Sequence, residues 1–143
     1  MRPTFFLKLL VLISGCKVNH LTGKKTFNPF SNKQLFPMAL QQYNSSLKEN
    51  KPVMGIKAQR QISKIVVDIV LVAQKYFAFK VQPNFLKEYV WEYNLVENEQ
   101  HNACCMPGGK IVFYTGILPI AQNPDGIAVI MGHEMAHALA DQG

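Results

Sequence analysis

The order of its predicted elements places this chain of 143 residues in the α+β class. Apolar residues recur at three- and four-residue steps from Ile56 to about Phe79, which predicts a long helix. From Glu88 to Tyr114 the residues alternate in character around a proline–glycine turn, which predicts short strands. An apolar run from Ile127 to Leu139 predicts a final helix that is buried almost all round. We therefore expect two helices, three antiparallel strands and a last helix packed beneath the small sheet.

The first helix is predicted from a capping box formed by Ser31 and Gln34, and it runs to about Leu47. Pro37 makes an irregular first turn or a later start possible, because proline lacks a backbone N–H. The second helix has one continuous apolar stripe, which we interpret as core and not as a site; it consists of Ile62, Ile65, Val66, Ile69, Val70, Ala73 and Phe77.

Three strands are expected after these helices: Glu88–Glu97, Asn102–Met106 and Ile111–Tyr114. The second and third form a hairpin around a turn that contains two glycines. Cys104 and Cys105 are adjacent, so on a strand they face opposite sides of the sheet. They lack the CxxC spacing of metal and redox sites, and we assign them neither a disulfide nor a zinc role.

Composition and charge narrow the classes of function. The net charge of +6 is spread along the chain, and its lysine clusters are too small for a nucleic-acid footprint. No nucleic acid is therefore expected as a partner. The length allows one domain, which we assign to residues 32–143.

The first residues have the pattern of a secretion signal. Arg2 and Lys8 precede a short apolar run that ends in small residues and Cys16. Such an ending resembles the bacterial lipobox, which implies a signal peptide over residues 1–15, a lipid on Cys16 and a tether over residues 16–31. We expect attachment to the cell envelope facing the periplasm, and Lys17 favours the outer membrane. A simple buried N-terminal strand is the alternative.

His133, Glu134 and His137 form an HExxH motif within the last apolar run. Side chains four residues apart share one face of a helix, so two imidazoles at this spacing can grip one metal ion. The carboxylate of Glu134 lies one position further round, where it can take a proton from the attacking water. Asn123 and Pro124 predict the start of this helix, as cap and first helical residue.

The run Asn102–Gly116, followed by Gly132–Ala140, resembles family forty-eight of the metallopeptidases, which includes HtpX and the CAAX prenyl proteases. The segment after Cys16 is similar to the family's bacterial lipoproteins. This resemblance implies the N-terminal part of a gluzincin-like zincin fold. It also implies Zn²⁺ as cofactor, with His133 and His137 as ligands, Glu134 as base and a glutamate on a downstream helix as third ligand.

That glutamate is absent before Gly143, so we expect a chain truncated at its C-terminus that retains zinc weakly. Asp141, one turn beyond His137, lies too far from His133 to share its ion. His101 and His20 are expected in loops as solvated side chains.

The resemblance also suggests how a polypeptide substrate binds. In zincins an extended peptide pairs with the edge strand above the metal helix, and Asn102 and Ala103 occupy that position here. We expect a zinc metalloendopeptidase, anchored through Cys16, that cleaves unfolded or membrane-associated polypeptides. The alternatives are a non-catalytic lipoprotein module that binds misfolded proteins through the hairpin edge, or a remnant without the third ligand. The sequence leaves the oligomeric state open.

Overall fold

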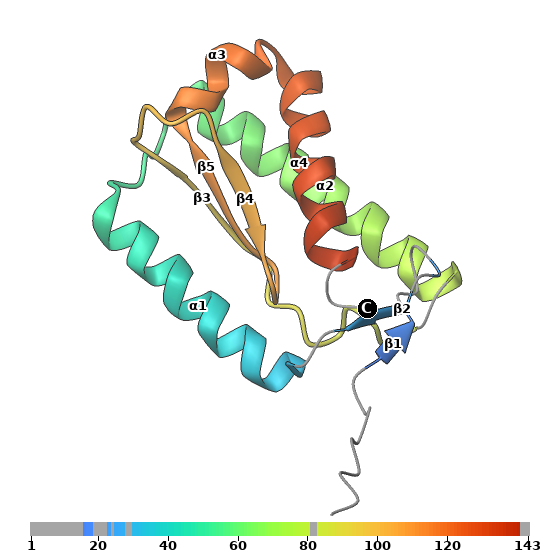
Figure 1. Ribbon diagram of the computed structural model, residues 1–143. Helices are drawn as coiled ribbons and strands as arrows, with labels where there is room; N and C mark the ends of the chain where they lie inside the picture. The colour runs from blue at the N-terminus through green and yellow to red at the C-terminus, as the bar shows by residue number, and fades with distance from the viewer. Residues whose placement is uncertain (1–15, 19–22, 24, 28–29, 81–82, 141–143) are drawn as a thin grey trace, which may run out of the picture.

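The computed structural model describes residues 16–18, 23, 25–27, 30–80 and 83–140. A three-stranded sheet lies between α1 on one face and α2 with α4 on the other (Figure 1). This arrangement confirms the α+β class. The elements are β1 (Cys16–Val18), β2 (Lys25–Phe27), α1 (Asn32–Glu49), α2 (Lys57–Lys80), β3 (Glu92–Val96), β4 (Ala103–Met106), β5 (Lys110–Tyr114), a 3₁₀ turn (Thr115–Ile117), α3 (Leu118–Ala121) and α4 (Pro124–Ala140).

The sheet has the order β3-β5-β4, and its strands are not all antiparallel as predicted. β4 and β5 form the predicted antiparallel hairpin, whereas β3 pairs parallel to β5. The segment between β3 and β4 crosses the end of β5, where the N–H of Gly116 donates to the carbonyl of Asn98 at 2.9 Å. A Cβ on Gly116 would lie 2.1 Å from the carbonyl oxygen of Glu99. This crossing places β5 between the other two strands.

Helix α1 begins as predicted, since the backbone N–H of Ser31 donates to Oε1 of Gln34 at 3.0 Å. Pro37 neither delays its start nor divides it, in contrast to the predicted irregular first turn. Pro37 has no backbone N–H to donate within the helix. The capping box before Pro37 and the packing of Tyr43 against the sheet after it stabilise the helix on both sides.

The two sides of the sheet belong to different hydrophobic clusters. Ile111 and Phe113 pack toward α2 and α4, while Val112, between them, packs toward α1. Cys105 belongs to the first cluster and Cys104 to the second, which confirms that the two thiols lie on opposite faces. Both are free cysteines and both are half-buried.

Helix α4 starts at the predicted cap. Oδ1 of Asn123 accepts a hydrogen bond from the N–H of Gly126 at 3.0 Å, and Pro124 is the first helical residue. A Cβ on Gly126 would lie 2.0 Å from the carbonyl oxygen of Ala121, so only glycine allows α3 and α4 to approach this closely. The cap and this close contact fix the direction in which α4 leaves α3.

The prediction that α4 is buried almost all round is wrong for one of its faces. The sheet and α2 cover one side of the helix, and the other side is open, with Val129 73% exposed. Beyond its first turn the exposed residues of α4 are Val129, His133, Ala136 and His137, and its buried ones are Ile127, Met131, Met135, Ala138 and Leu139. The two histidines of the motif thus lie on the open face.

The predicted tether contains β1 and β2, which pair with each other in antiparallel fashion. We did not predict these strands, whose three residues each are too few to show an alternating pattern. The predicted signal peptide, residues 1–15, lies outside the described residues. Among the helices that are described, none combines the length and the hydropathy needed to cross a membrane.

Candidate metal centre

The ring nitrogens of the two motif histidines converge on the open face of α4. Nε2 of His133 lies 3.1 Å from Nε2 of His137. The rings are nearly perpendicular, at 82°, with their centroids 4.4 Å apart. The four-residue spacing therefore brings two imidazoles together as predicted.

This geometry fits a zinc ion. Two Zn–N bonds of about 2.0–2.1 Å at a tetrahedral angle hold their nitrogens about 3.3 Å apart. The observed separation of 3.1 Å is close to that value, and both side chains are exposed on the same face. Within residues 30–80 and 83–140, no further His, Cys, Asp or Glu completes a group of three possible ligands.

Glu134 occupies a different position from the histidines. It is half-buried, and after burial, the main cause, its charge is a smaller cause of the raised pKa of Cys104 and Cys105 on β4. No hydrogen bond to this carboxylate comes from the described residues.

The thiol of Cys105, which is near this carboxylate, is unreactive. Burial, followed by the charges of Cys104 and Glu134, raises its pKa to about 12. It therefore stays protonated at neutral pH and competes neither for a metal ion nor for a proton.

β4 is an edge strand packed against α4, as the predicted substrate position requires. The backbone groups of Asn102, however, already have hydrogen-bond partners. Its carbonyl accepts from the N–H of Tyr114 at 3.1 Å, and its N–H donates to Gln100 at 3.0 Å. Because pairing directions alternate along a strand, Ala103 and Cys105 are the residues whose backbone groups point away from β5. The backbone groups of Asn102 thus have partners within the protein and those of Ala103 point away from β5, while substrate binding by either residue stays a prediction.

Sequence reasoning missed Cys105 as part of this edge. The hairpin register could have identified it, because residues two apart on a strand direct their backbone groups to the same side.

Fewer structural observations concern the other candidate residues, which are His101, His20, Asp141 and Cys16. His101 is exposed. His20 and Asp141 lie outside the described residues, and Cys16 is known only as a backbone position in β1, opposite Phe27. Lipidation of Cys16 stays a prediction.

The chain is similar to known metalloendopeptidases. Residues 57–142, more than half of the chain, match the profile of Peptidase family M48. The mitochondrial metalloendopeptidase OMA1 of Saccharomyces cerevisiae is 42% identical over 62 residues, which is 42% of this chain and 18% of the relative. The enzyme of the same name from Schizosaccharomyces pombe is 36% identical over 55 residues, 38% of this chain and 16% of the relative. The matched part of the chain thus covers less than a fifth of the length of each relative.

Proposed function

This chain belongs to Peptidase family M48, and we propose from this premise that it is the metal-binding part of a zinc-dependent metalloendopeptidase. The observation that carries the proposal is the 3.1 Å approach of two histidine nitrogens on the open face of α4, with Glu134 next to His133 in the sequence. His133 and His137 hold the metal, and Glu134 is the general base. The named activity of the relatives supports the same reaction class.

The zinc ion supplies Lewis-acid chemistry, acidifying water and polarising the scissile carbonyl. The protein provides the remaining parts. The imidazole nitrogens of His133 and His137 would hold the ion. The carboxylate of Glu134 takes the proton of the attacking water and can return it to the leaving amine.

A polypeptide substrate would be aligned by the free edge of β4. The N–H and carbonyl of Ala103 point outward, so an extended chain can pair with them without disturbing β5. Such pairing uses backbone groups alone, which suits unfolded or membrane-associated polypeptides of varied sequence. Ala103→Pro removes an outward N–H and no ladder hydrogen bond, so it should impair cleavage while leaving zinc content unchanged.

The direct test is cleavage of casein, an unfolded polypeptide, by the intact parent protein and by its Glu134→Gln variant. Glutamine keeps the size of the side chain but cannot act as a base, so we expect a loss of about 10²–10⁴-fold in rate with unchanged zinc content. Activity of the variant equal to that of the parent would exclude Glu134 as base. Zinc-dependent peptide capture without cleavage by the parent would favour the non-catalytic binding module.

Membrane attachment through a lipid on Cys16, with location in a bacterial cell envelope, is a separate proposal. Its support is the pattern of residues 1–16, whereas the names of the relatives point to mitochondria. Mass spectrometry of the mature N-terminus decides between them. A diacylated Cys16 supports the envelope location, and an unmodified Cys16 excludes it.

A further inference from the structure

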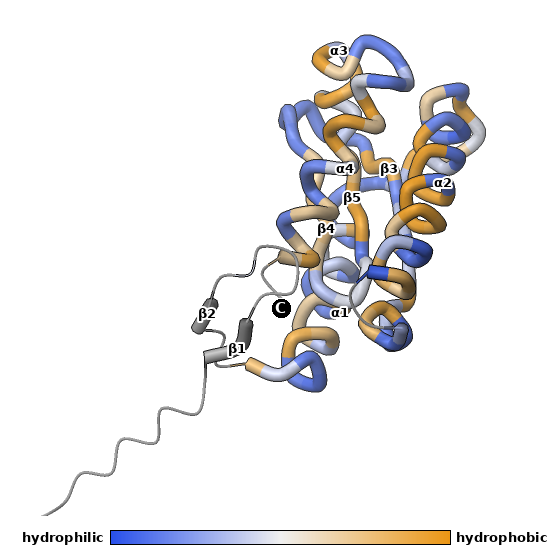
Figure 2. Tube along the Cα trace, turned by 90° about the vertical axis from the view of Figure 1, so that its right-hand side faces the viewer, coloured by the Kyte–Doolittle hydropathy of each residue, from blue (hydrophilic) through white to orange (hydrophobic). Residues whose placement is uncertain are grey.

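The outer face of α2 carries large apolar side chains in contact with water. We define this face by Val67, Leu71, Val72, Lys75, Tyr76 and Phe79. Phe79 is 82% exposed and Val72 is 67% exposed, while Leu71, Val67 and Tyr76 are each about half exposed. The opposite side of the same helix buries Ile62, Val66, Val70 and Phe77 in the core. Figure 2 shows that apolar and hydrophilic residues alternate along the helix.

These residues form one connected surface, because Val67, Leu71, Lys75 and Phe79 follow one another at four-residue steps. Val72 and Tyr76 lie beside this row at the same spacing. A contiguous exposed apolar surface of this kind marks a contact with a partner or a membrane.

The charges on α2 indicate which of the two it contacts. The helix carries five basic side chains and one acidic one, and all six are exposed: Lys57, Arg60, Lys64, Lys75, Lys80 and Asp68. The single carboxylate, Asp68, is already paired with Lys64 at 2.9 Å. The other four basic groups are a cationic surplus that suits an anionic surface.

The position of the lysines within the apolar row favours lipid over protein. Lys75 lies between Leu71 and Phe79, and lysine is depleted from protein–protein interfaces. At a lipid surface the same arrangement is favourable, because the aliphatic stem of a lysine contacts the apolar zone while its ammonium group reaches the phosphates. Tyr76 and Phe79 are suited to the boundary between headgroups and acyl chains.

We propose that the outer face of α2 docks on an anionic lipid bilayer, with Leu71, Val72 and Phe79 entering the headgroup boundary and Lys75 and Lys80 contacting lipid phosphates. This contact is independent of any lipid on Cys16 and of the metal centre on α4.

The test is co-sedimentation of the 143-residue chain with vesicles. Cys16→Ser is introduced in every sample, so that an attached lipid cannot contribute. We expect binding to vesicles of phosphatidylcholine mixed with phosphatidylserine, little binding to phosphatidylcholine alone, and weakening by added salt. Leu71→Ser with Phe79→Ser should weaken binding about tenfold or more. Lys75→Gln with Lys80→Gln should weaken it by a similar factor.

Met38→Ser with Val90→Ser is the matched control, since these two apolar residues are also well exposed, at 59% and 63%, but lie away from α2. The control should bind vesicles like the parent, and circular dichroism checks that every variant is folded. Three results would overturn the proposal: no binding to anionic vesicles, equal weakening by the control, or a dimer in analytical ultracentrifugation that the Leu71/Phe79 variant dissociates. The last result would assign the face to a second copy of the chain.

Discussion

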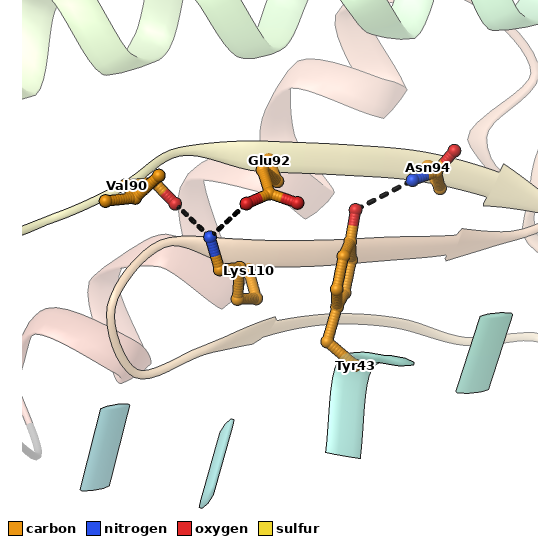
Figure 3. A network of polar contacts seen from close by, with 5 residues as sticks. All are labelled: Tyr43, Val90, Glu92, Asn94 and Lys110. Carbon is orange, nitrogen blue, oxygen red and sulfur yellow. Dashed lines mark hydrogen bonds and ion pairs between the residues drawn. The ribbon is translucent and has the colours of Figure 1, made fainter. Parts of the chain in front are cut away.

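On the α1 side of the sheet polar pairs contribute to packing, whereas the buried face of α4 contributes only apolar side chains. Nζ of Lys110, almost fully buried, donates to the carbonyl of Val90 and to Oε1 of Glu92, each at 2.6 Å (Figure 3). Tyr43, from α1, accepts a hydrogen bond from Nδ2 of Asn94 at 2.7 Å (Figure 3). On α4 the buried residues are Ile127, Met131, Met135, Ala138 and Leu139.

The α1 side of the sheet and the buried face of α4 therefore have different roles. Polar pairs fix which groups of α1 and the sheet meet, because a buried donor or acceptor without its partner is costly. Apolar packing holds α4 without presenting any polar group that could compete for its histidines. The helix is therefore anchored on one face and chemically free on the other.

Removing apolar volume from the anchored face should have the largest effect. Met131 is fully buried at 0% exposure, so Met131→Ala should lower the free energy of unfolding by about 2–5 kcal/mol. Val129→Ala, on the open face of the same helix, should change it by no more than about 0.5 kcal/mol. Denaturant unfolding measures both, and equal losses would show that α4 has no privileged buried face.

A smaller effect is expected from the polar side of the sheet. Lys110→Met keeps the apolar stem but leaves the carbonyl of Val90 without its donor, which should cost about 1–3 kcal/mol. Glu92 is half-exposed and can be solvated by water, so the lost ion pair adds little. Lys64→Met, which breaks the exposed pair with Asp68, is the control and should cost less than about 0.5 kcal/mol. A stable Lys110→Met variant would mean that this buried contact does not specify the packing.

The smallest effect is expected from Cys105, which packs against the core on the α2 and α4 side of the sheet. Burial raises the pKa of this thiol from 9.0 to about 12, so the folded state disfavours the thiolate. Its contribution to stability is fully present below pH 9.0 and is lost as the pH rises toward about 12. Cys105→Ala should make stability less dependent on pH in this window, measured by urea unfolding at a series of pH values.

Cys104→Ala provides the comparison, because the pKa of that thiol is also raised by burial but is partly lowered again by a hydrogen bond from Val112. It should flatten the pH dependence less than Cys105→Ala does. A stronger effect of Cys104→Ala would contradict the assignment of Cys105 to the more apolar side of the sheet.

Local signals in the sequence predicted much of this structure. The capping box at Ser31, the cap at Asn123 and the HExxH spacing each depend on neighbours within four residues, and all three have the expected geometry. The stripe from Ile62 to Phe77 likewise predicted the core face of α2. Where a structure depends on short-range hydrogen bonds and helical periodicity, the residues alone suffice.

The errors concern long-range arrangement. Alternation in β3 does not distinguish a parallel from an antiparallel neighbour, and the crossing near Gly116 depends on contacts with Glu99 that no local pattern shows. The open face of α4 was missed because Val129 and Ala136 are apolar, although nothing in the described chain covers them. For the same reason the exposed row on α2 was not predicted, since an apolar residue in a helix pattern does not indicate which side is covered.

The most direct test of the metal centre is zinc binding measured by calorimetry on the 143-residue chain and on three variants. We predict weak binding by the chain, its loss in His133→Ala and in His137→Ala, and its retention in Glu134→Gln. Zinc binding that survives either histidine substitution would contradict the central claim that this pair on the open face of α4 holds the metal.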